Sequence, residues 1–207
     1  MTLTGKPLAE FLAAVQQPDP TPGGGSVSAL AGALGASLLV MVASMPRHRA
    51  RTEEDMERLR AAGDRCREIS SRLEALLDED SRSYDRVIAA YRLPKDSQEA
   101  KAARSASIQA ALRGAIETPL AVMARAVEAL DAASIVAAFG SANAASDVGV
   151  ALELLGAGVR GASINVDINL ETVTDAGYAT RIRQQAQDLV RVCESGVSAA
   201  REQLTGR

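Results

Sequence analysis

Apolar residues recur every three or four positions along most of this chain, which is the spacing that puts side chains on one face of an α-helix. This pattern predicts helices over residues 4–17, 26–45, 52–91, 97–131, 132–138, 142–172 and 175–203. Strand-like alternation is weak and confined to 164–169, in a helical context. We therefore expect one all-α domain over residues 1–207, built as a bundle of long up-and-down helices.

The stretch between Pro20 and Pro46 differs from the rest of the chain because it carries no charged residue. Its length is enough to span a bilayer. It also contains several serines and glycines, and no second segment of this kind occurs in the chain. These features favour a buried central helix over a membrane span, and we expect no membrane association.

A glycine run precedes this apolar helix, and Pro22 followed by three glycines predicts a loop rather than a helix or a strand. Ser26 is then the expected N-cap, since its hydroxyl can accept a hydrogen bond from a free backbone N–H. One interpretation is a flexible turn before a core helix. The other is a ligand-binding loop in which Gly24, Gly25 and Ser26 present N–H groups at the positive end of a helix dipole.

The composition narrows the class of protein. The chain has no Trp, two Phe and three Tyr, which favours helices packed through small side chains. We expect the faces rich in Gly and Ala on helices 26–45 and 142–172 to form the contact of a homodimer. The net charge of −3, with acids and bases interspersed, does not suggest a nucleic-acid partner. A single histidine excludes a His-rich metal site, and Cys66 and Cys193 are expected to be buried free thiols. With no signal-peptide pattern at the N-terminus, we expect a cytoplasmic protein.

Asp80 is the most informative polar residue on the long helix, because it falls on the same stripe as Leu73, Leu76 and Leu77. A carboxylate that faces the core is costly unless it is paired, hydrogen-bonded or protonated. Tyr84 lies four residues on and shares this face, so we expect its hydroxyl to orient Asp80. Asp80 is therefore either a proton-transfer group or a partner in an ion pair or an interhelical hydrogen bond, whereas the neighbouring Asp78 is expected to be solvated.

Two further polar groups occur on the predicted helix 142–172. Asn143, Ser146 and Asp147 share a face at its start, and either line a polar ligand or cap the helix. Asn165 and Asn169 lie four residues apart, and helix–helix hydrogen bonding is the favoured interpretation for them.

A basic segment that includes Arg47, His48 and Arg49 follows the apolar helix. Cations at this position stabilise the negative end of the helix dipole, and a solvated loop is the simplest interpretation. Such a cluster also suits a ligand with several carboxylates.

Taken in order, these motifs resemble the cyclodeaminase/cyclohydrolase family of folate enzymes over residues 8–200. The resemblance rests on the ordered set Pro20–Ser26, Asp80 with Tyr84, Tyr91–Lys95, Ile108-Gln109 with Ala111-Leu112, Pro119-Leu120, Asn143 with Ser146-Asp147, and Asn165-Val166 with Asn169-Leu170. It implies an all-helical homodimer with a folate cleft at or near the dimer interface and a catalytic aspartate at Asp80. Many members carry a lysine-rich segment after the apolar helix, where this chain has Met45–Arg51.

The resemblance implies one of two reactions, and neither needs a cofactor or a metal. One is hydrolysis of 5,10-methenyltetrahydrofolate to 10-formyltetrahydrofolate. The other is release of ammonia from formiminotetrahydrofolate. Hydrolysis is favoured because no formiminotransferase half is attached. By the same resemblance, Gly24, Gly25, Ser26, Tyr84, Asn143, Ser146 and Asp147 line the folate site, while Arg47, His48 and Arg49 bind the glutamyl tail. A non-enzymatic helical dimer is the third possibility, which a solvent-facing Asp80 would favour.

Overall fold

A computed structural model describes residues 2–205 of the chain, and this range contains six α-helices, one short 3₁₀-helix and no strand. The helices are α1 (Leu8–Val15), α2 (Gly24–Ala43), α3 (Glu53–Tyr91), α4 (Gln98–Phe139), η1 (Ala142–Ala144), α5 (Ala145–Leu170) and α6 (Ala176–Thr205). The prediction of an all-α bundle is confirmed.

Three of the predicted helix starts are confirmed by their caps. The Thr52 side chain accepts from the backbone N–H of Asp55, and Asp55 completes a capping box with Thr52. Ser97 accepts from the N–H of Ala100 at 3.0 Å. Asp175 likewise accepts from the N–H of Tyr178 at 2.9 Å, so each of these caps satisfies an N–H that the helix leaves unpaired.

Other boundaries differ from the prediction. The expected N-cap at Ser26 is wrong, because α2 begins at Gly24 and Gly23 is its N-cap. The separate piece expected at 132–138 is also wrong, because α4 runs without interruption from Gln98 to Phe139 and includes Pro119. The first helix has 8 residues and starts after Pro7, which is well suited to a helix start because it lacks an N–H.

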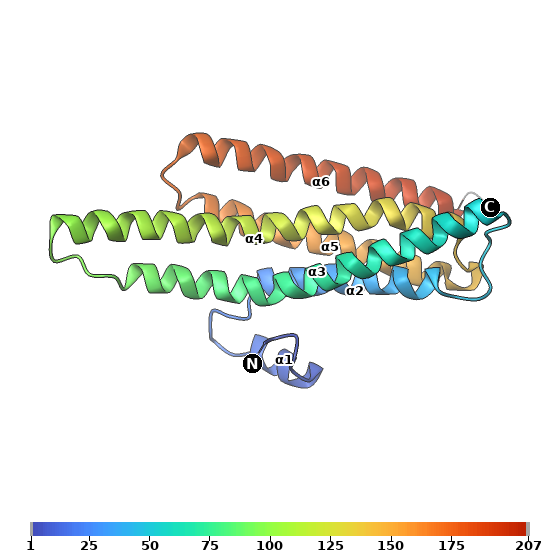
Figure 1. Ribbon diagram of the computed structural model, residues 1–207, viewed down its shortest axis with the longest axis horizontal. Coiled ribbons are helices and arrows are strands. Elements are labelled where there is room, and N and C mark those ends of the chain that lie inside the picture. The colour runs from blue at the N-terminus through green and yellow to red at the C-terminus, as the bar shows by residue number, and fades with distance from the viewer. Residues whose placement is uncertain (1, 206–207) are drawn as a thin grey trace.

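Helices α2 to α6 lie lengthwise beside one another, and the short α1 lies on the flank of the bundle (Figure 1). α2 and α3 run antiparallel, since Gly25 lies against Asp80 whereas Gly63 lies against Ala43. The hairpin formed by the end of α3 and the start of α4 extends beyond the N-terminus of α2 (Figure 1). This overhang is closed by its own small apolar cluster of Ala90, Ile108 and Leu112.

α2 packs closely against α5 through glycine, whereas α4 is the helix that contacts each of α2, α3, α5 and α6. A Cβ built on Gly35 would lie 2.9 Å from the carbonyl oxygen of Ala151, and one on Gly158 would lie 3.0 Å from that of Ser28. The small residues of α2 and α5 therefore serve contacts within one chain. By length and composition α2 could cross a membrane. Half of its apolar window is buried inside the bundle and Val27, Leu34 and Met41 are exposed, so the expectation of a buried helix holds for one face only.

Both cysteines are buried free thiols, as the sequence predicts. Burial raises the pKa of Cys66 to about 12, so this thiol stays protonated at neutral pH.

Candidate active site

The arrangement of α2 and α3 brings Asp80 to the first turn of α2. The hydroxyl of Ser26 donates to Asp80 Oδ2 at 2.9 Å, and the backbone N–H of Ser26 also donates to this carboxylate. The same hydroxyl lies 3.2 Å from the carbonyl oxygen of Leu77 and 3.4 Å from the hydroxyl of Ser81. Ser26 has no exposed surface, so these contacts are made out of solvent.

Gly25 explains how the carboxylate comes so close to the backbone. A Cβ built on Gly25 would lie 2.6 Å from Asp80 Cγ, a distance that real Cβ atoms do not adopt. Only glycine therefore allows Asp80 to lie against the first turn of α2. The free N–H groups and the positive dipole end at this turn favour a negative charge.

Asp80 is half-buried, in agreement with the inward position expected from the apolar stripe that it shares with Leu73, Leu76 and Leu77. Burial is the largest influence and raises the pKa of Asp80, while the hydroxyl and N–H of Ser26 act in the opposite direction. No ion pair to Asp80 occurs within residues 2–205, which excludes the buried salt bridge considered from the sequence for this range. A partly desolvated carboxylate without a counter-charge is suited to exchange a proton.

Asn165 is a site residue that the sequence pattern did not identify. Its side chain on α5 lies beside the start of α2: a Cβ built on Gly24 would be 3.7 Å from Asn165 Nδ2. That nitrogen donates to the carbonyl of Gly161 at 2.9 Å. Its neighbour Asn169 bonds across to the carbonyl of Ala115 on α4, as expected for helix–helix bonding. Only the antiparallel packing of α2 on α5, which no local pattern specifies, distinguishes the two amides.

Tyr84 follows Asp80 by one turn, on the part of α3 that overhangs α2. Its side chain is 37% exposed, so its ring is accessible to a ligand. No hydrogen bond joins Tyr84 to Asp80 within the described residues, and the group that orients the carboxylate is Ser26. The expectation that the Tyr84 hydroxyl orients Asp80 is therefore wrong.

The basic segment lies at the opposite end of α2. This 20-residue helix is about 30 Å long, so Arg47, His48 and Arg49 are far from Asp80 within one chain. Arg49 donates to the carbonyls of Ala137 and Gly140 and so binds the end of α4, a role that the sequence did not indicate. His48 lines a separate cavity of about 330 Å³ between α2 and α3.

The polar residues at the start of α5 lie at that same far end. Asn143 and Ser146 are exposed, and Asp147 is half-exposed in the first turn of α5. Neither Ser141 nor Asn143 caps a helix through its side chain; the N-cap of α5 is Ala144. Within one chain the structure therefore does not join this group to Asp80, and a single cleft shared by both groups is not formed by one copy.

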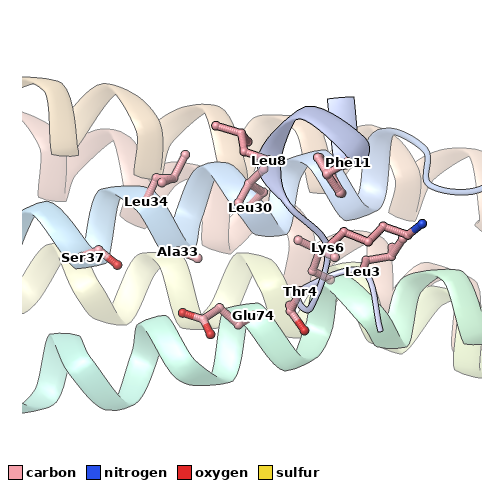
Figure 2. Close-up of a pocket in the computed structure, with 11 residues that line it drawn as sticks. Leu3, Thr4, Lys6, Leu8, Phe11, Leu30, Ala33, Leu34, Ser37 and Glu74 are labelled. Atoms are coloured by element: carbon pink, nitrogen blue, oxygen red, sulfur yellow. The ribbon is translucent and has the colours of Figure 1, made fainter. Parts of the chain in front are cut away.

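A second cavity, of about 340 Å³, lies between the N-terminal segment and the flank of α2 and α3 (Figure 2). It is lined by Leu3, Thr4, Lys6, Leu8, Phe11, Leu30, Ala33, Leu34, Ser37, Glu74 and Leu77. The segment is held by Asp78, whose carboxylate accepts from the N–H of Leu3 and the hydroxyl of Thr4. Asp78 is 9% exposed, so its predicted solvation is wrong. This mostly apolar cavity is lined by neither Asp80 nor Ser26.

Comparison with known proteins identifies the family of this chain. The family model described as formiminotransferase-cyclodeaminase matches residues 7–188. A methenyltetrahydrofolate cyclohydrolase of Methylorubrum extorquens is 36% identical over 180 residues, which cover 87% of this chain and 86% of that protein. A formimidoyltransferase-cyclodeaminase of Sus scrofa is 34% identical over 206 residues, and this chain spans only 38% of its length.

The fold is shared with a solved structure as well. The crystal structure of formiminotetrahydrofolate cyclodeaminase from Thermotoga maritima superposes with a TM-score of 0.86 at 26% identity. The match covers 98% of this chain and 97% of that one. Sequence and structure thus agree over nearly the whole length, and the chain belongs to the formiminotransferase-cyclodeaminase family.

Proposed function

We propose that this protein hydrolyses 5,10-methenyltetrahydrofolate to 10-formyltetrahydrofolate, with Asp80 as the proton-transfer group. The observation that carries the proposal is the half-buried carboxylate of Asp80, which is held by Ser26 without a counter-charge. The 36% identity to a methenyltetrahydrofolate cyclohydrolase, over 86% of that protein, supports hydrolysis.

The chemistry follows from the substrate. The methenyl carbon bridges two nitrogens as a cationic amidinium and is already electrophilic. Water adds to this carbon while Asp80 accepts the water proton. The C–N bond to one ring nitrogen then breaks as Asp80 returns the proton to that nitrogen. The hydroxyl on the carbon loses its proton to solvent, which leaves a formyl group on the other nitrogen. The carbon keeps its oxidation level, so the reaction needs no redox partner, and the negative charge of Asp80 also favours binding of the cation.

In this proposal the substrate binds beside the first turn of α2, where Gly24, Gly25 and Asn165 lie near Asp80. Tyr84 follows Asp80 by one turn of α3 and is 37% exposed, so its ring offers an apolar face for a planar ring of the substrate.

A second reaction is supported by the solved relative, whose title names a formiminotetrahydrofolate cyclodeaminase. In that reaction a ring nitrogen attacks the formimino carbon, and Asp80 protonates the departing ammonia. The same carboxylate serves both reactions, because both pass through a tetrahedral carbon that bears two nitrogens and a third heteroatom.

The functional unit in this proposal is a homodimer. α2 exposes Val27, Leu34 and Met41 at seven-residue intervals, and α5 exposes Ile164 and its neighbour Ile168. These residues form an apolar stripe on two adjacent helices, with the spacing of a helix-packing seam.

A second copy of the chain fits this stripe better than lipid does. Glu153, Arg160 and Asp167 recur every seventh residue on α5, and all three are exposed. A charged side chain at the centre of a bilayer costs about 2.5–3.5 kcal/mol, whereas protein interfaces commonly have an apolar centre and a polar rim. In a dimer with antiparallel α2 helices, the end that carries Arg47, His48, Asn143, Ser146 and Asp147 lies beside the partner's Asp80 end.

The test is spectrophotometric. Purified protein is mixed with methenyltetrahydrofolate, and the methenyl absorbance is expected to fall faster than in buffer alone. With formiminotetrahydrofolate, a rise in the same absorbance and release of ammonia would replace the hydrolase proposal with the deaminase. If neither substrate reacts faster than in buffer, both proposals are wrong.

A further inference from the structure

Ser26 differs from the other serines of α2 because its hydroxyl donates a hydrogen bond to the carboxylate of Asp80. It is fully buried, and the two nearest acceptors for its single proton are Asp80 Oδ2 at 2.9 Å and the Leu77 carbonyl at 3.2 Å, while the Ser81 hydroxyl lies farther away at 3.4 Å. Both acceptors belong to α3, so the hydroxyl links two helices. It does not cap its own helix, which starts two residues earlier.

Ser28 provides the contrast within the same helix. It is also buried, at 7% exposure, but its hydroxyl donates at 2.7 Å to the carbonyl of Gly24, one turn back in α2. Such a bond satisfies the serine locally and makes no contact with Asp80. The two serines thus form a matched pair that differs in the partner of the hydroxyl.

We propose that Ser26 is a positioning residue that supports Asp80 in both of its protonation states, an inference that rests on the proposed function. When Asp80 is ionised, the Ser26 hydroxyl donates to Oδ2. When Asp80 holds the proton taken from water, the hydroxyl turns to the Leu77 carbonyl. No covalent bond changes in this step; one hydroxyl proton moves from one acceptor to another by rotation about the Cβ–Oγ bond.

The two acceptors matter because the site is buried. A buried hydroxyl that loses its acceptor is destabilised. With the Leu77 carbonyl in reach, the Ser26 hydroxyl keeps an acceptor when Asp80 becomes neutral, so it opposes proton uptake by Asp80 less than a hydroxyl with a single acceptor would. Gly25 completes the arrangement, since the absence of a side chain there lets the carboxylate lie against the backbone of α2.

The other groups around Asp80 do not provide this support. On its own helix, Glu79 pairs with Arg82 and Arg86, and Asp78 binds the N-terminal segment. α2 contains no titratable side chain from Gly24 to Ala43. The polar side chain that borders the site from α5 is the amide of Asn165. Ser26 is therefore the side chain bonded to Asp80 among residues 2–205.

The experiment compares Ser26→Ala with Ser28→Ala. The pKa of Asp80 is measured on the substrate-free protein by ¹³C NMR of the aspartate carboxyls, with its signal identified by its loss in Asp80→Asn. Removing the Ser26 hydroxyl removes a donor to the ionised form, so the pKa of Asp80 should rise in Ser26→Ala and stay unchanged in Ser28→Ala. The kcat should fall by about 10- to 100-fold in Ser26→Ala alone, the factor expected for one hydrogen bond to a charged group.

The inference is overturned if the pKa of Asp80 is the same in Ser26→Ala and the wild type, or if Ser28→Ala shifts it equally. Ser26→Cys keeps the shape with a weaker donor, and it must shift the pKa in the same direction if Ser26→Ala does not fold. If the wild type converts neither folate, the proposed function fails, and the NMR measurement still decides whether Ser26 is coupled to Asp80.

Discussion

Gly25 and Asp80 are in close contact, so one methyl group added at Gly25 should affect the stability and the activity of the protein differently. In most helical positions Gly→Ala stabilises by up to about 1 kcal/mol. In Gly25→Ala the new Cβ would lie 2.6 Å from Asp80 Cγ, so the carboxylate must move. We expect a folded variant whose kcat falls by about 10-fold or more, since a displaced group loses its alignment with the substrate.

Gly24→Ala is the matched control for this prediction. A Cβ at Gly24 meets Asn165 Nδ2 at 3.7 Å, which is an ordinary contact. Its Cβ does not displace Asp80, so this variant should keep its kcat in the same assay, and an effect of the added methyl group on the substrate should be confined to KM. Equal losses in both variants would mean that the first turn of α2 matters only for folding.

The raised pKa of Asp80 also predicts how stability depends on pH. Burial raises the folded-state pKa above the unfolded value, so the folded protein binds the proton more tightly. The contribution of Asp80 to stability is therefore greatest below the unfolded pKa of about 4 and is lost as the pH rises through the folded pKa. Thermal melts should show that Asp80→Asn gains stability relative to the wild type over this pH rise.

Glu79→Gln should show the opposite trend. The hydrogen bond from Arg86 is the main cause that lowers the pKa of Glu79, so its contribution is present above the unfolded pKa and is lost on acidification. If Asp80→Asn were instead destabilised at neutral pH, as we expect of Glu79→Gln, then Asp80 would pair with a positively charged group, contrary to the arrangement described above.

At the level of helices, the packing of α2 on α5 is set by glycine contacts that tolerate no added atom. A Cβ on Gly35 would lie 2.9 Å from both the Ala151 oxygen and Leu155 Cγ, whereas one on Gly149 has no neighbour within 4 Å. Gly35→Ala should lower the free energy of unfolding by about 1–3 kcal/mol, as overpacked sites do. Gly149→Ala should raise it by up to about 1 kcal/mol. Denaturant titration measures both, and equal effects would contradict the close α2–α5 contact.

Local patterns predicted the elements better than the contacts between them. The caps at Thr52, Ser97 and Asp175 satisfy N–H groups next to them in sequence, so the chain itself contains the signal. Ser26 was misassigned because its bond to Asp80 joins residues 54 positions apart. The apolar stripe of α3 predicts that the Asp80 side chain faces the bundle. Its partner there depends on which helix packs against α3, and no local pattern specifies that.

At the scale of the whole molecule, the sequence predicted that small residues form the dimer contact. That prediction assumed that the faces rich in Gly and Ala are free to contact a second copy, and this assumption is wrong. The glycine faces are used inside the chain, where Gly35 and Gly158 allow α2 and α5 to approach. The exposed face of these helices carries larger apolar side chains, such as Leu34 and Ile164. Small residues suit any close helix contact, and sequence alone does not say whether the contact lies within one chain or between two.

The proposed dimer can be tested at this face. Ile164 is 64% exposed on α5, and Ile164→Glu would place a charge in the centre of the stripe. We expect the wild type to sediment as a dimer at micromolar concentration and Ile164→Glu to sediment as a folded monomer. Val192 on α6 is also exposed, at 50%, and Val192→Glu should remain dimeric. A monomeric wild type would refute the proposed interface.

The central claim is that Asp80 transfers the proton, and turnover by Asp80→Asn tests it most directly. The amide keeps the shape of the side chain and can still accept from Ser26, so the variant should fold and assemble as the wild type does. Its kcat with the converted folate should fall by about 100-fold or more, the usual effect of losing a general acid–base group. Substrate binding should weaken less. Turnover near the wild-type rate in the folded variant would contradict the mechanism.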